Sequence, residues 1–253
     1  MEEIKSDNLE FDYQSVFEVD DYLYFYEDGL TAERTEREVN FLIEQMGITP
    51  SHRILDIPCG FGRHTNLLAE KGFEITGVDF SSGFLEIAEK EAKERGLTVN
   101  YIQEDMRNIA FREEFERIFM AFTSFGYFND NENIQVIKNF YKALKPGGLL
   151  CFDTFNRDQF LKKFLPFIVS ERGDDLMIDR NRFDCKSGRL YNRRMVIRNG
   201  QIKQKPFFVR LYNYNEINQL LTEVGFKIKK VLGNWRGDDF TFDSFTMITI
   251  AEK

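Results

Sequence analysis

The 253-residue sequence lacks the features on which secreted, disulfide-bonded and membrane proteins depend. Its three cysteines, Cys59, Cys151 and Cys185, form no CxxC pair, so we predict no disulfide framework and no metal site. No apolar run approaches the roughly 18 residues that cross a bilayer. The first residues, MEEIKSDNLEFD, are acidic and polar rather than signal-like. We therefore expect a cytoplasmic protein without a membrane partner.

Charge is unevenly distributed along the chain. The net charge of −8 disfavours non-specific binding of nucleic acid by the whole surface. Residues 180–210 nevertheless carry ten Lys or Arg and a single acid, Asp184, which leaves −17 on the rest of the chain. Three interpretations of this basic segment stay open: a solvated face of a sheet, a field that attracts an anionic small substrate, or a nucleic-acid contact surface.

Short apolar runs alternate with longer amphipathic ones through the middle of the chain. The runs typical of strands are 53–57, 74–79, 99–103, 117–122 and 149–154. Between them lie helical patterns, one of which begins at the capping residue Ser81 or Ser82. Strands alternating with helices indicate βαβ units, and therefore a mostly parallel sheet covered on both faces. We predict an α/β fold with a doubly wound sheet.

Two regions depart from this alternation. Before the first strand, two helical patterns are separated by an Asp-Gly turn, and Thr31 is a plausible N-cap for the second. After the fifth strand, residues from about 165 to 211 carry strand-like runs around the hairpin signal Asn199-Gly200. We predict four segments: an N-terminal helical cap (1–50), a core (51–155), an antiparallel β insertion (156–211), and a helix with the last two core strands (212–253).

The stretch DIPCGFG, residues 56–62, joins the first strand to the first helix. Glycines let a ligand approach the backbone, and a helix N-terminus offers free N–H groups. Thr65 stands where the dinucleotide fingerprint G-x-G-x-x-G requires a third glycine. Asp79, at the end of the second strand, suits a bidentate hydrogen bond to two ribose hydroxyls. Asp105 and Met106 could contact a purine by a polar and an apolar group.

These motifs resemble those of class I S-adenosylmethionine-dependent methyltransferases of the small-molecule type. The resemblance runs through LDIPCGFGRHT, ITGVDFS, QEDMRNI and ALKPGGLL, in that order, over residues from about 40 to 155. It implies a Rossmann-like, seven-stranded sheet whose last strand is antiparallel. It also implies the cofactor S-adenosylmethionine, which leaves as S-adenosylhomocysteine, and a methyl transfer by in-line displacement.

The resemblance also assigns cofactor contacts. It implies that Asp56 and the loop backbone hold the methionine moiety, that Asp79 binds the ribose, and that Asp105 accepts from the adenine amino group. The full set of implied cofactor residues is Asp56, Cys59, Gly60, Gly62, Asp79, Phe80, Asp105, Met106 and Thr123. On this basis Cys59 is a compact packing residue under the cofactor rather than a nucleophile.

Assignments on the acceptor side are less specific. The candidates for substrate contact are Tyr24, Arg34, Tyr127, Tyr214 and Trp235. The catalytic residue is not identified by any motif, and Tyr127 and His64 are candidates. Each also has an ordinary interpretation: Tyr127 as a core aromatic, His64 as a packing residue, and Trp235 as part of a hydrophobic rim.

We predict a methyltransferase with a small, unidentified and possibly anionic acceptor. An RNA or protein methyltransferase that uses the basic insertion is the enzymatic alternative. A cofactor-binding partner protein without turnover is an alternative of another class. No NPPY-type tetrapeptide follows the fourth strand, which disfavours a nucleic acid without excluding it. The sequence specifies neither the accepting atom nor the oligomeric state.

Overall fold

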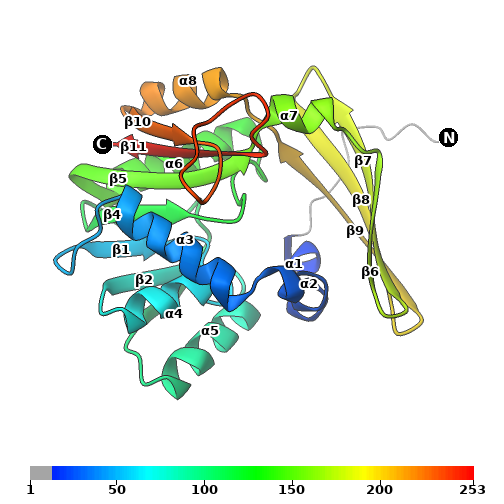
Figure 1. Cartoon of the computed structure of the whole chain (residues 1–253), viewed down its shortest axis with the longest axis horizontal. Coiled ribbons are helices and arrows are strands. Elements are labelled where there is room, and N and C mark those ends of the chain that lie inside the picture. Colours follow the sequence, from blue (N-terminus) through cyan, green and yellow to red (C-terminus); the bar gives the residue numbers. More distant parts are fainter. Residues whose placement is uncertain (1–12) are drawn as a thin grey trace. The chain divides into compact units, whose positions relative to one another are not determined.

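The computed structural model describes residues 13–253, which form two compact units (Figure 1). Among the described residues, the first unit comprises 13–29 and Phe164–Arg210, and the second comprises Leu30–Lys163 and Leu211–Lys253. The acidic start of the sequence, residues 1–12, lies outside the described residues. This division places the first predicted N-terminal helix in one unit and the second in the other. The segment boundaries at 50, 155 and 211 stay a prediction.

The second unit is built on a seven-stranded sheet with the order β10-β11-β5-β4-β1-β2-β3 (Figure 1). Its strands are β1 (Arg53–Asp56), β2 (Glu74–Asp79), β3 (Asn100–Gln103), β4 (Phe115–Met120), β5 (Leu144–Phe155), β10 (Lys227–Leu232) and β11 (Thr246–Glu252). β11 runs antiparallel to both of its neighbours, whereas β1 to β5 pair in parallel. The predicted Rossmann-like sheet with a reversed last strand is therefore confirmed.

Helices connect the strands of this sheet. They are α3 (Ala32–Gln45), α4 (Arg63–Glu70), α5 (Ser82–Glu94), α6 (Asp130–Ala143), α7 (Arg157–Lys162) and α8 (Tyr214–Val224). α4 packs between α3 and α5, and α6 packs against α8. The chain winds from β1 toward β2 on one side and from β4 toward β5 on the other, so right-handed crossovers place these two groups on opposite faces.

The helix starts follow the capping signals in the sequence. The side chain of Thr31 accepts a hydrogen bond from Arg34 N at the start of α3, and Ser81 accepts from Phe84 N at the start of α5. Such caps satisfy backbone N–H groups that have no partner inside the helix. Both predicted N-caps are confirmed, and they fix where these two helices begin relative to the strands.

One hydrophobic cluster of the second unit lies between α3 and the sheet. Val39, Leu42 and Met46 on α3 are buried against a cluster that includes Ile54 and Phe119. Burying one such side chain is worth about 1.5–3 kcal/mol. These apolar side chains fasten α3 to the sheet and turn the helix face that carries Glu38 inward, where Glu38 is 1% exposed.

The first unit contains a four-stranded antiparallel sheet, β6 (Phe167–Arg172), β7 (Asp175–Asp184), β8 (Arg189–Arg198) and β9 (Gln201–Arg210), in chain order. Asn199 and Gly200 link β8 to β9 with φ values of 51° and 72°. Two positive φ values in a two-residue loop are typical of a type I′ turn, so the hairpin signal is confirmed. The unit also contains α1 (Tyr13–Val16), α2 (Val19–Tyr26) and the 3₁₀ turn η1 (Glu27–Gly29).

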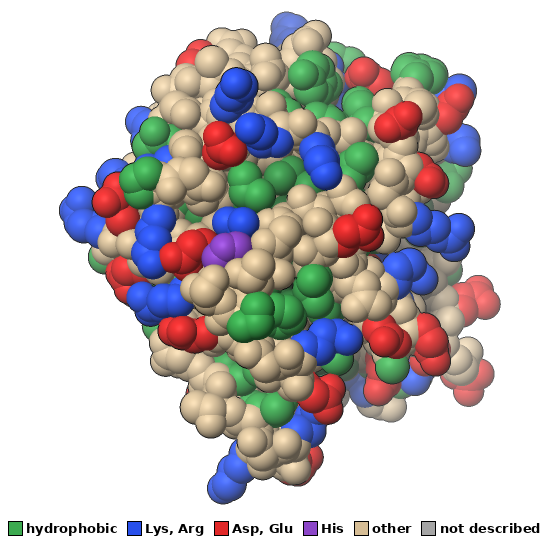
Figure 2. All heavy atoms as spheres, turned by 60° about the vertical axis from the view of Figure 1, so that its left-hand side comes forward, with side chains coloured by type: hydrophobic (Ala, Val, Ile, Leu, Met, Phe, Trp, Pro, Cys, Tyr) green, Lys and Arg blue, Asp and Glu red, His purple; other side chains and the backbone are tan. Residues whose placement is uncertain are grey.

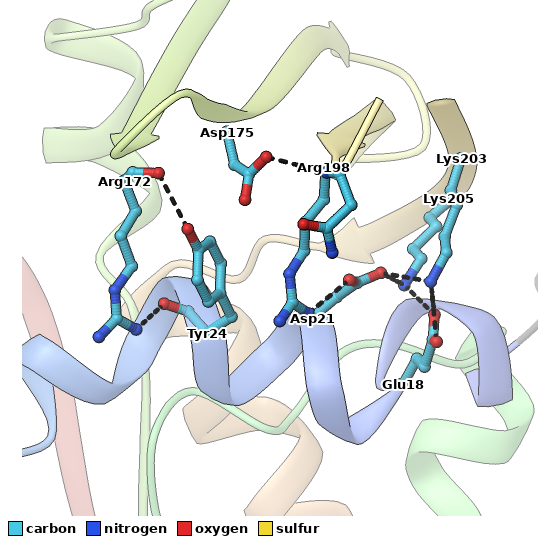
Figure 3. A network of polar contacts seen from close by, with 9 residues as sticks. Glu18, Asp21, Tyr24, Arg172, Asp175, Arg198, Lys203 and Lys205 are labelled. Carbon is cyan, nitrogen blue, oxygen red and sulfur yellow. Dashed lines mark hydrogen bonds and ion pairs between the residues drawn. The ribbon is translucent and has the colours of Figure 1, made fainter. Parts of the chain in front are cut away.

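Buried ion pairs fasten α2 to β9 (Figure 3). Lys205 Nζ lies 2.6 Å from Asp21 Oδ2 and 2.7 Å from Glu18 Oε2, and Lys203 contacts the same two carboxylates at 3.1 and 2.9 Å. Arg198 reaches Asp21 Oδ1 at 3.2 Å. Asp21 and Lys205 are only 5% and 3% exposed. Burial raises the pKa of Asp21, but the hydrogen bonds from Lys205 and Lys203 outweigh it and hold the pKa well below its usual value.

These contacts correct one interpretation of the basic segment. A solvated sheet face would leave its basic side chains in water, yet Arg194 is 9% exposed and donates to both carboxylate oxygens of Asp179 at 2.8 and 2.9 Å. Lys205 is likewise buried. Asp179 of β7, next to the segment in the sequence, and the distant acids Glu18 and Asp21 neutralise part of the charge that the segment carries.

No helix among residues 13–253 is long and apolar enough to cross a membrane.

We expect Asp21→Asn to destabilise the first unit by roughly 3 kcal/mol, because it leaves Lys205 buried with one carboxylate fewer. Urea unfolding, monitored by amide hydrogen exchange in β9, measures this loss. Asp20→Asn, at an exposed position of the same helix, is the matched control. Because the pKa of Asp21 is depressed, its contribution to the free energy of unfolding is present above about pH 4 and is lost below it. The free energies of unfolding of the two variants should therefore converge at low pH. Equal stability of both variants at pH 7 would contradict the role of this ion pair.

Candidate functional site

The carboxyl ends of β1 and β4 form the topological switch point of the second unit. From β1 the chain crosses to β2, and from β4 it crosses to β5 in the opposite direction along the sheet. In open α/β sheets, ligands bind outside the strand ends at such a point, because the connecting loops separate there. The DIPCGFG stretch begins at the end of β1 and therefore lies at this crevice.

The loop after β1 is held by backbone hydrogen bonds to the neighbouring strands. Ile57 N donates to Phe119 O at 3.1 Å, and Cys59 N donates to Val78 O at 2.9 Å. The peptide bond between Ile57 and Pro58 is cis. Gly60 has a φ of +54°, and a Cβ added to it would meet no atom within 4 Å. The loop therefore presents bare backbone to open space at Gly60, as a ligand that approaches the main chain requires.

Gly62 serves a different purpose from Gly60. Its φ is +80°, and an added Cβ would lie 2.5 Å from Tyr101 Oη and 2.7 Å from Ala88 Cβ. Gly62 is also the N-cap of α4. Close packing against α5 and β3 thus requires this glycine, whereas the sequence pattern grouped both glycines as ligand contacts.

Asp79 joins the loop to the second strand. Its Oδ2 accepts from Gly60 N at 2.8 Å and its Oδ1 accepts from Ser81 N at 2.9 Å. The side chain is 3% exposed, and burial raises its pKa to about 6. Each oxygen keeps a lone pair that a ligand hydroxyl could use.

Asp56 lies deeper than its predicted role suggests. It is 1% exposed and its Oδ2 accepts from Thr65 Oγ1 at 2.6 Å. Burial raises its pKa to about 8, although the Thr65 hydrogen bond and the charge of Arg63 act in the opposite direction. At pH 7 this carboxyl group is therefore largely protonated, and a nearby cation would favour its charged form.

Cys59 packs inside the loop. It is 7% exposed, and burial together with the charges of Asp56 and Asp79 raises its thiol pKa well above the usual value. A nucleophilic cysteine needs a lowered pKa. The packing role predicted for Cys59 agrees with this environment.

A cluster of charged residues surrounds Glu38 of α3. Its carboxylate accepts from Arg34 Nε at 2.8 Å, lies 2.6 Å from Arg63 Nη1 and is 2.8 Å from His64 Nε2. Burial lowers the pKa of His64 to about 4, so this imidazole is neutral. The candidate base His64 is 4% exposed and already engaged, which agrees with its packing interpretation.

The chain after β4 is strained at two successive residues. Phe122 and Thr123 have φ values of 65° and 54°, a region that non-glycine residues rarely occupy. Thr123 N donates to Asp153 Oδ1 at 3.0 Å, and burial raises the pKa of Asp153 to about 7. Residues 121–122, predicted as strand, therefore lie in this turn instead. Such strain is found where surrounding contacts hold a functional loop.

The residues predicted to flank the adenine follow β2 and β3. Asp105 is bound at both oxygens by Arg107, with Nε distances of 3.1 and 3.0 Å, and Arg107 also reaches Glu132 at 2.7 Å. Phe80 and Met106 are half-buried. The sequence analysis did not anticipate Arg107. Because Arg107 binds both carboxylate oxygens of Asp105, only their remaining lone pairs can accept a hydrogen bond from a ligand.

The acceptor-side candidates are scattered. Tyr127 is half-buried in the loop after β4, and Tyr214, the first residue of α8, is 41% exposed. The Trp235 ring lies 5.1 Å from that of Phe41 and borders a hollow of about 480 Å³ over α3, which is lined mostly by charged side chains. Tyr24 belongs to the first unit, where its hydroxyl donates to Arg172 O at 3.0 Å (Figure 3).

Sequence reasoning missed Glu38, Arg63 and Asp153. A signal for Glu38 was present, because an acid at 38 falls beside Val39 and four residues before Leu42, on the buried face of the helix. Nothing in the sequence marked Asp153, which lies inside a buried strand.

The residues at the crevice fit an S-adenosyl ligand. Arg63 Nη2 is buried and has no hydrogen-bond partner among residues 13–253. A buried donor without a partner is costly, and an anionic group would satisfy it. The open backbone at Gly60 and the carboxylate of Asp79 supply the neighbouring contacts.

The two glycines should respond differently to alanine. Gly62→Ala forces a Cβ into Tyr101 and Ala88, so we expect a loss of roughly 2–4 kcal/mol in the free energy of unfolding. Gly60→Ala has space and should cost only about 1 kcal/mol for its positive φ. Urea unfolding measures both, and calorimetry with S-adenosylhomocysteine should show weaker binding by Gly60→Ala. Equal stability losses would contradict the distinction.

Asp56→Asn should make the unliganded protein relatively more stable as the pH rises. Because the folded-state pKa of Asp56 is raised to about 8, the wild type loses stability between the unfolded pKa and pH 8, and the amide does not. Between pH 5 and pH 8, we expect the free energy of unfolding of Asp56→Asn to rise by about 1–3 kcal/mol relative to that of the wild type. Urea unfolding at the two pH values measures the shift, and a constant difference would contradict the raised pKa.

Comparisons with known proteins agree with this geometry. A family model described as "Methyltransferase domain" matches residues 54–148. The putative methyltransferase YqeM of Bacillus subtilis is 26% identical over 208 residues, covering 79% of this chain and 84% of that protein. An S-adenosylmethionine-dependent methyltransferase from Clostridium acetobutylicum has a TM-score of 0.77 at 19% identity, covering 92% of this chain and 98% of that one. The SAM-bound amino pentose methyltransferase CalS10 of Micromonospora echinaspora has a TM-score of 0.59 at 18% identity, covering 97% and 98%.

The matched model begins within β1 and ends within β5, so it contains the loop at the switch point, Asp79, and the strained turn after β4. The region from β1 to β5 therefore matches a methyltransferase domain, and the chain has the fold of the solved S-adenosylmethionine-dependent methyltransferases.

Proposed function

We propose that this protein is an S-adenosylmethionine-dependent methyltransferase that acts on a small molecule, and that the crevice at the switch point of the second unit holds the cofactor. The observation that carries this proposal is the combination of open backbone at Gly60, the Asp79 carboxylate and the unsatisfied donor of Arg63. Together they offer partners to a nucleoside and to an amino-acid carboxylate from the loop after β1, the end of β2 and the start of α4.

In this proposal, Asp79 accepts from the ribose hydroxyls while its hydrogen bonds from Gly60 and Ser81 fix its orientation. Phe80 and Met106 border the adenine, and Asp105 accepts from the adenine amino group on the side that Arg107 leaves available. Phe80 follows β2, and Asp105 and Met106 follow the adjacent strand β3, so the adenine ring could contact all three.

The loop residues take the methionine moiety in this proposal. Asp56 stabilises the ammonium group, which in turn would favour the ionised form of the carboxyl group. The backbone of Cys59, Gly60 and Gly62 lines the site, and Thr123 faces it from the turn after β4.

When bound, the cofactor supplies a methyl group that its sulfonium already activates. The residues of the chain then contribute position and orientation, which can be worth roughly 7–11 kcal/mol. If the acceptor must lose a proton, Tyr127 is better placed than His64, because His64 is buried against Glu38.

The paired charges of the first unit favour a small acceptor over RNA. Arg194 and Lys205 are buried in ion pairs within that unit, so they offer little to phosphates. Figure 2 shows acidic and basic side chains interspersed on a face of the molecule that carries the second unit. The remaining basic side chains of the insertion keep an RNA or protein acceptor as the alternative.

Calorimetry with S-adenosylmethionine and S-adenosylhomocysteine tests the site directly. We expect both to bind, and Asp79→Asn to bind about 10- to 100-fold more weakly, because it removes charge-assisted hydrogen bonds. Glu36→Gln, at an exposed position of α3, is the control. Unchanged binding by Asp79→Asn would contradict the ribose assignment.

The acceptor class is tested with radiolabelled cofactor. The protein is incubated separately with pooled small amines and hydroxy compounds, with RNA, and with protein extract. We expect label in the small-molecule pool, including amino sugars, and no more label in RNA or protein than Asp79→Asn produces. Label confined to RNA or protein would overturn the small-molecule proposal.

A further inference from the structure

Glu38 organises the charges beside the crevice. Its carboxylate is 1% exposed and contacts three side chains, from Arg34 on its own helix and from Arg63 and His64 at the start of α4. Burial raises the pKa of Glu38, but the hydrogen bond from His64 and the charge of Arg63 outweigh burial and keep the group ionised. A single carboxylate thus joins α3 to the loop that follows β1.

The cluster carries more positive than negative charge. Arg34 and Arg63 are cationic, Glu38 is anionic, and His64 is neutral because burial lowers its pKa to about 4. Burial raises the pKa of the nearby carboxyl group of Asp153 to about 7, so this group supplies only part of a negative charge at neutral pH. A net positive charge therefore remains at this buried site, where an anion would be stabilised.

The guanidinium groups of Arg34 and Arg63 both lie near the ring of Phe122. Arg34 Cζ lies 5.1 Å and Arg63 Cζ 5.9 Å from the ring centre of Phe122. Phe122 follows β4 at the switch point, and Arg63 directly follows Gly62. Arg63 is 11% exposed at its side chain, and its Nη2 has no partner among the described residues.

We propose that Glu38 is a positioning residue that holds Arg34 and Arg63 side by side as the binding site for the carboxylate of the cofactor's methionine moiety. A carboxylate suits this site because guanidinium groups bind it through paired N–H donors. The cofactor is the source because Arg63 continues the loop that passes Gly60. This inference rests on the proposed function, since it assumes that the crevice binds the S-adenosyl group.

Three ligands separate this role from a merely structural one. S-adenosylhomocysteine carries the carboxylate and the amine, its decarboxylated analogue keeps only the amine, and methylthioadenosine lacks both. For the wild type we expect S-adenosylhomocysteine to bind at least tenfold more tightly than the decarboxylated analogue, as measured by calorimetry.

For Glu38→Gln we expect S-adenosylhomocysteine to bind about 10- to 100-fold more weakly, because the two arginines lose the charge that orients them. Binding of the decarboxylated analogue and of methylthioadenosine should stay within about threefold of the wild type, because neither ligand has a carboxylate to lose. Arg63→Lys, which keeps the charge but not the forked donors, should show the same selective loss. Glu36→Gln, two residues away and exposed, should match the wild type.

Each other outcome overturns the proposal. Equal wild-type affinity for the first two ligands would mean that no carboxylate site exists. An equal loss for all three ligands in both Glu38→Gln and Arg63→Lys would show that the cluster only supports the fold. Failure of the wild type to bind even methylthioadenosine would overturn the proposed cofactor crevice itself, which distinguishes that failure from the failure of this inference.

Discussion

The buried carboxylate of Glu38 is the interaction on which the arrangement of the crevice depends. It binds side chains from α3 and α4 within 2.8 Å, and both of those helices are anchored to the sheet by apolar packing. A buried carboxylate without cationic partners is very unfavourable. Moving α4 away from α3 would remove the partners that α4 supplies to Glu38, so this ion cluster opposes separation of the two helices. The loop between β1 and α4 is thereby held in one place, with its open backbone at Gly60 toward the crevice.

The same physical rule shapes the first unit. Asp21 and Lys205 are buried together, and each would be costly to bury alone. What reads in the sequence as a run of positive charge is thus partly the counter-charge of an acidic helix. This pairing explains why a strongly basic segment occurs in an acidic protein without requiring an anionic partner.

Much of the fold could be predicted because its signals are local. Alternating apolar runs gave the parallel strands, Thr31 and Ser81 gave helix starts, and Asn199-Gly200 gave a hairpin. The strained turn at Phe122 was missed, because apolar residues continue past the end of β4 and a period-two pattern does not report φ. The different roles of Gly60 and Gly62 were also hidden, because they depend on the distances to Tyr101 and Ala88.

The sequence by itself predicted a ligand crevice, since glycines and acids at the ends of successive strands must meet at one edge of a parallel sheet. Its resemblance to class I S-adenosylmethionine-dependent methyltransferases implied which cofactor binds there, and a packing role for Cys59. Only the tertiary structure decided which charges are partners. Glu38 meets Arg63 and His64 at sequence separations of 25 and 26 residues, and Asp21 meets Lys205 at a separation of 184. The energy of a buried charge depends on its neighbours in space, and those neighbours are chosen by packing rather than by spacing along the chain.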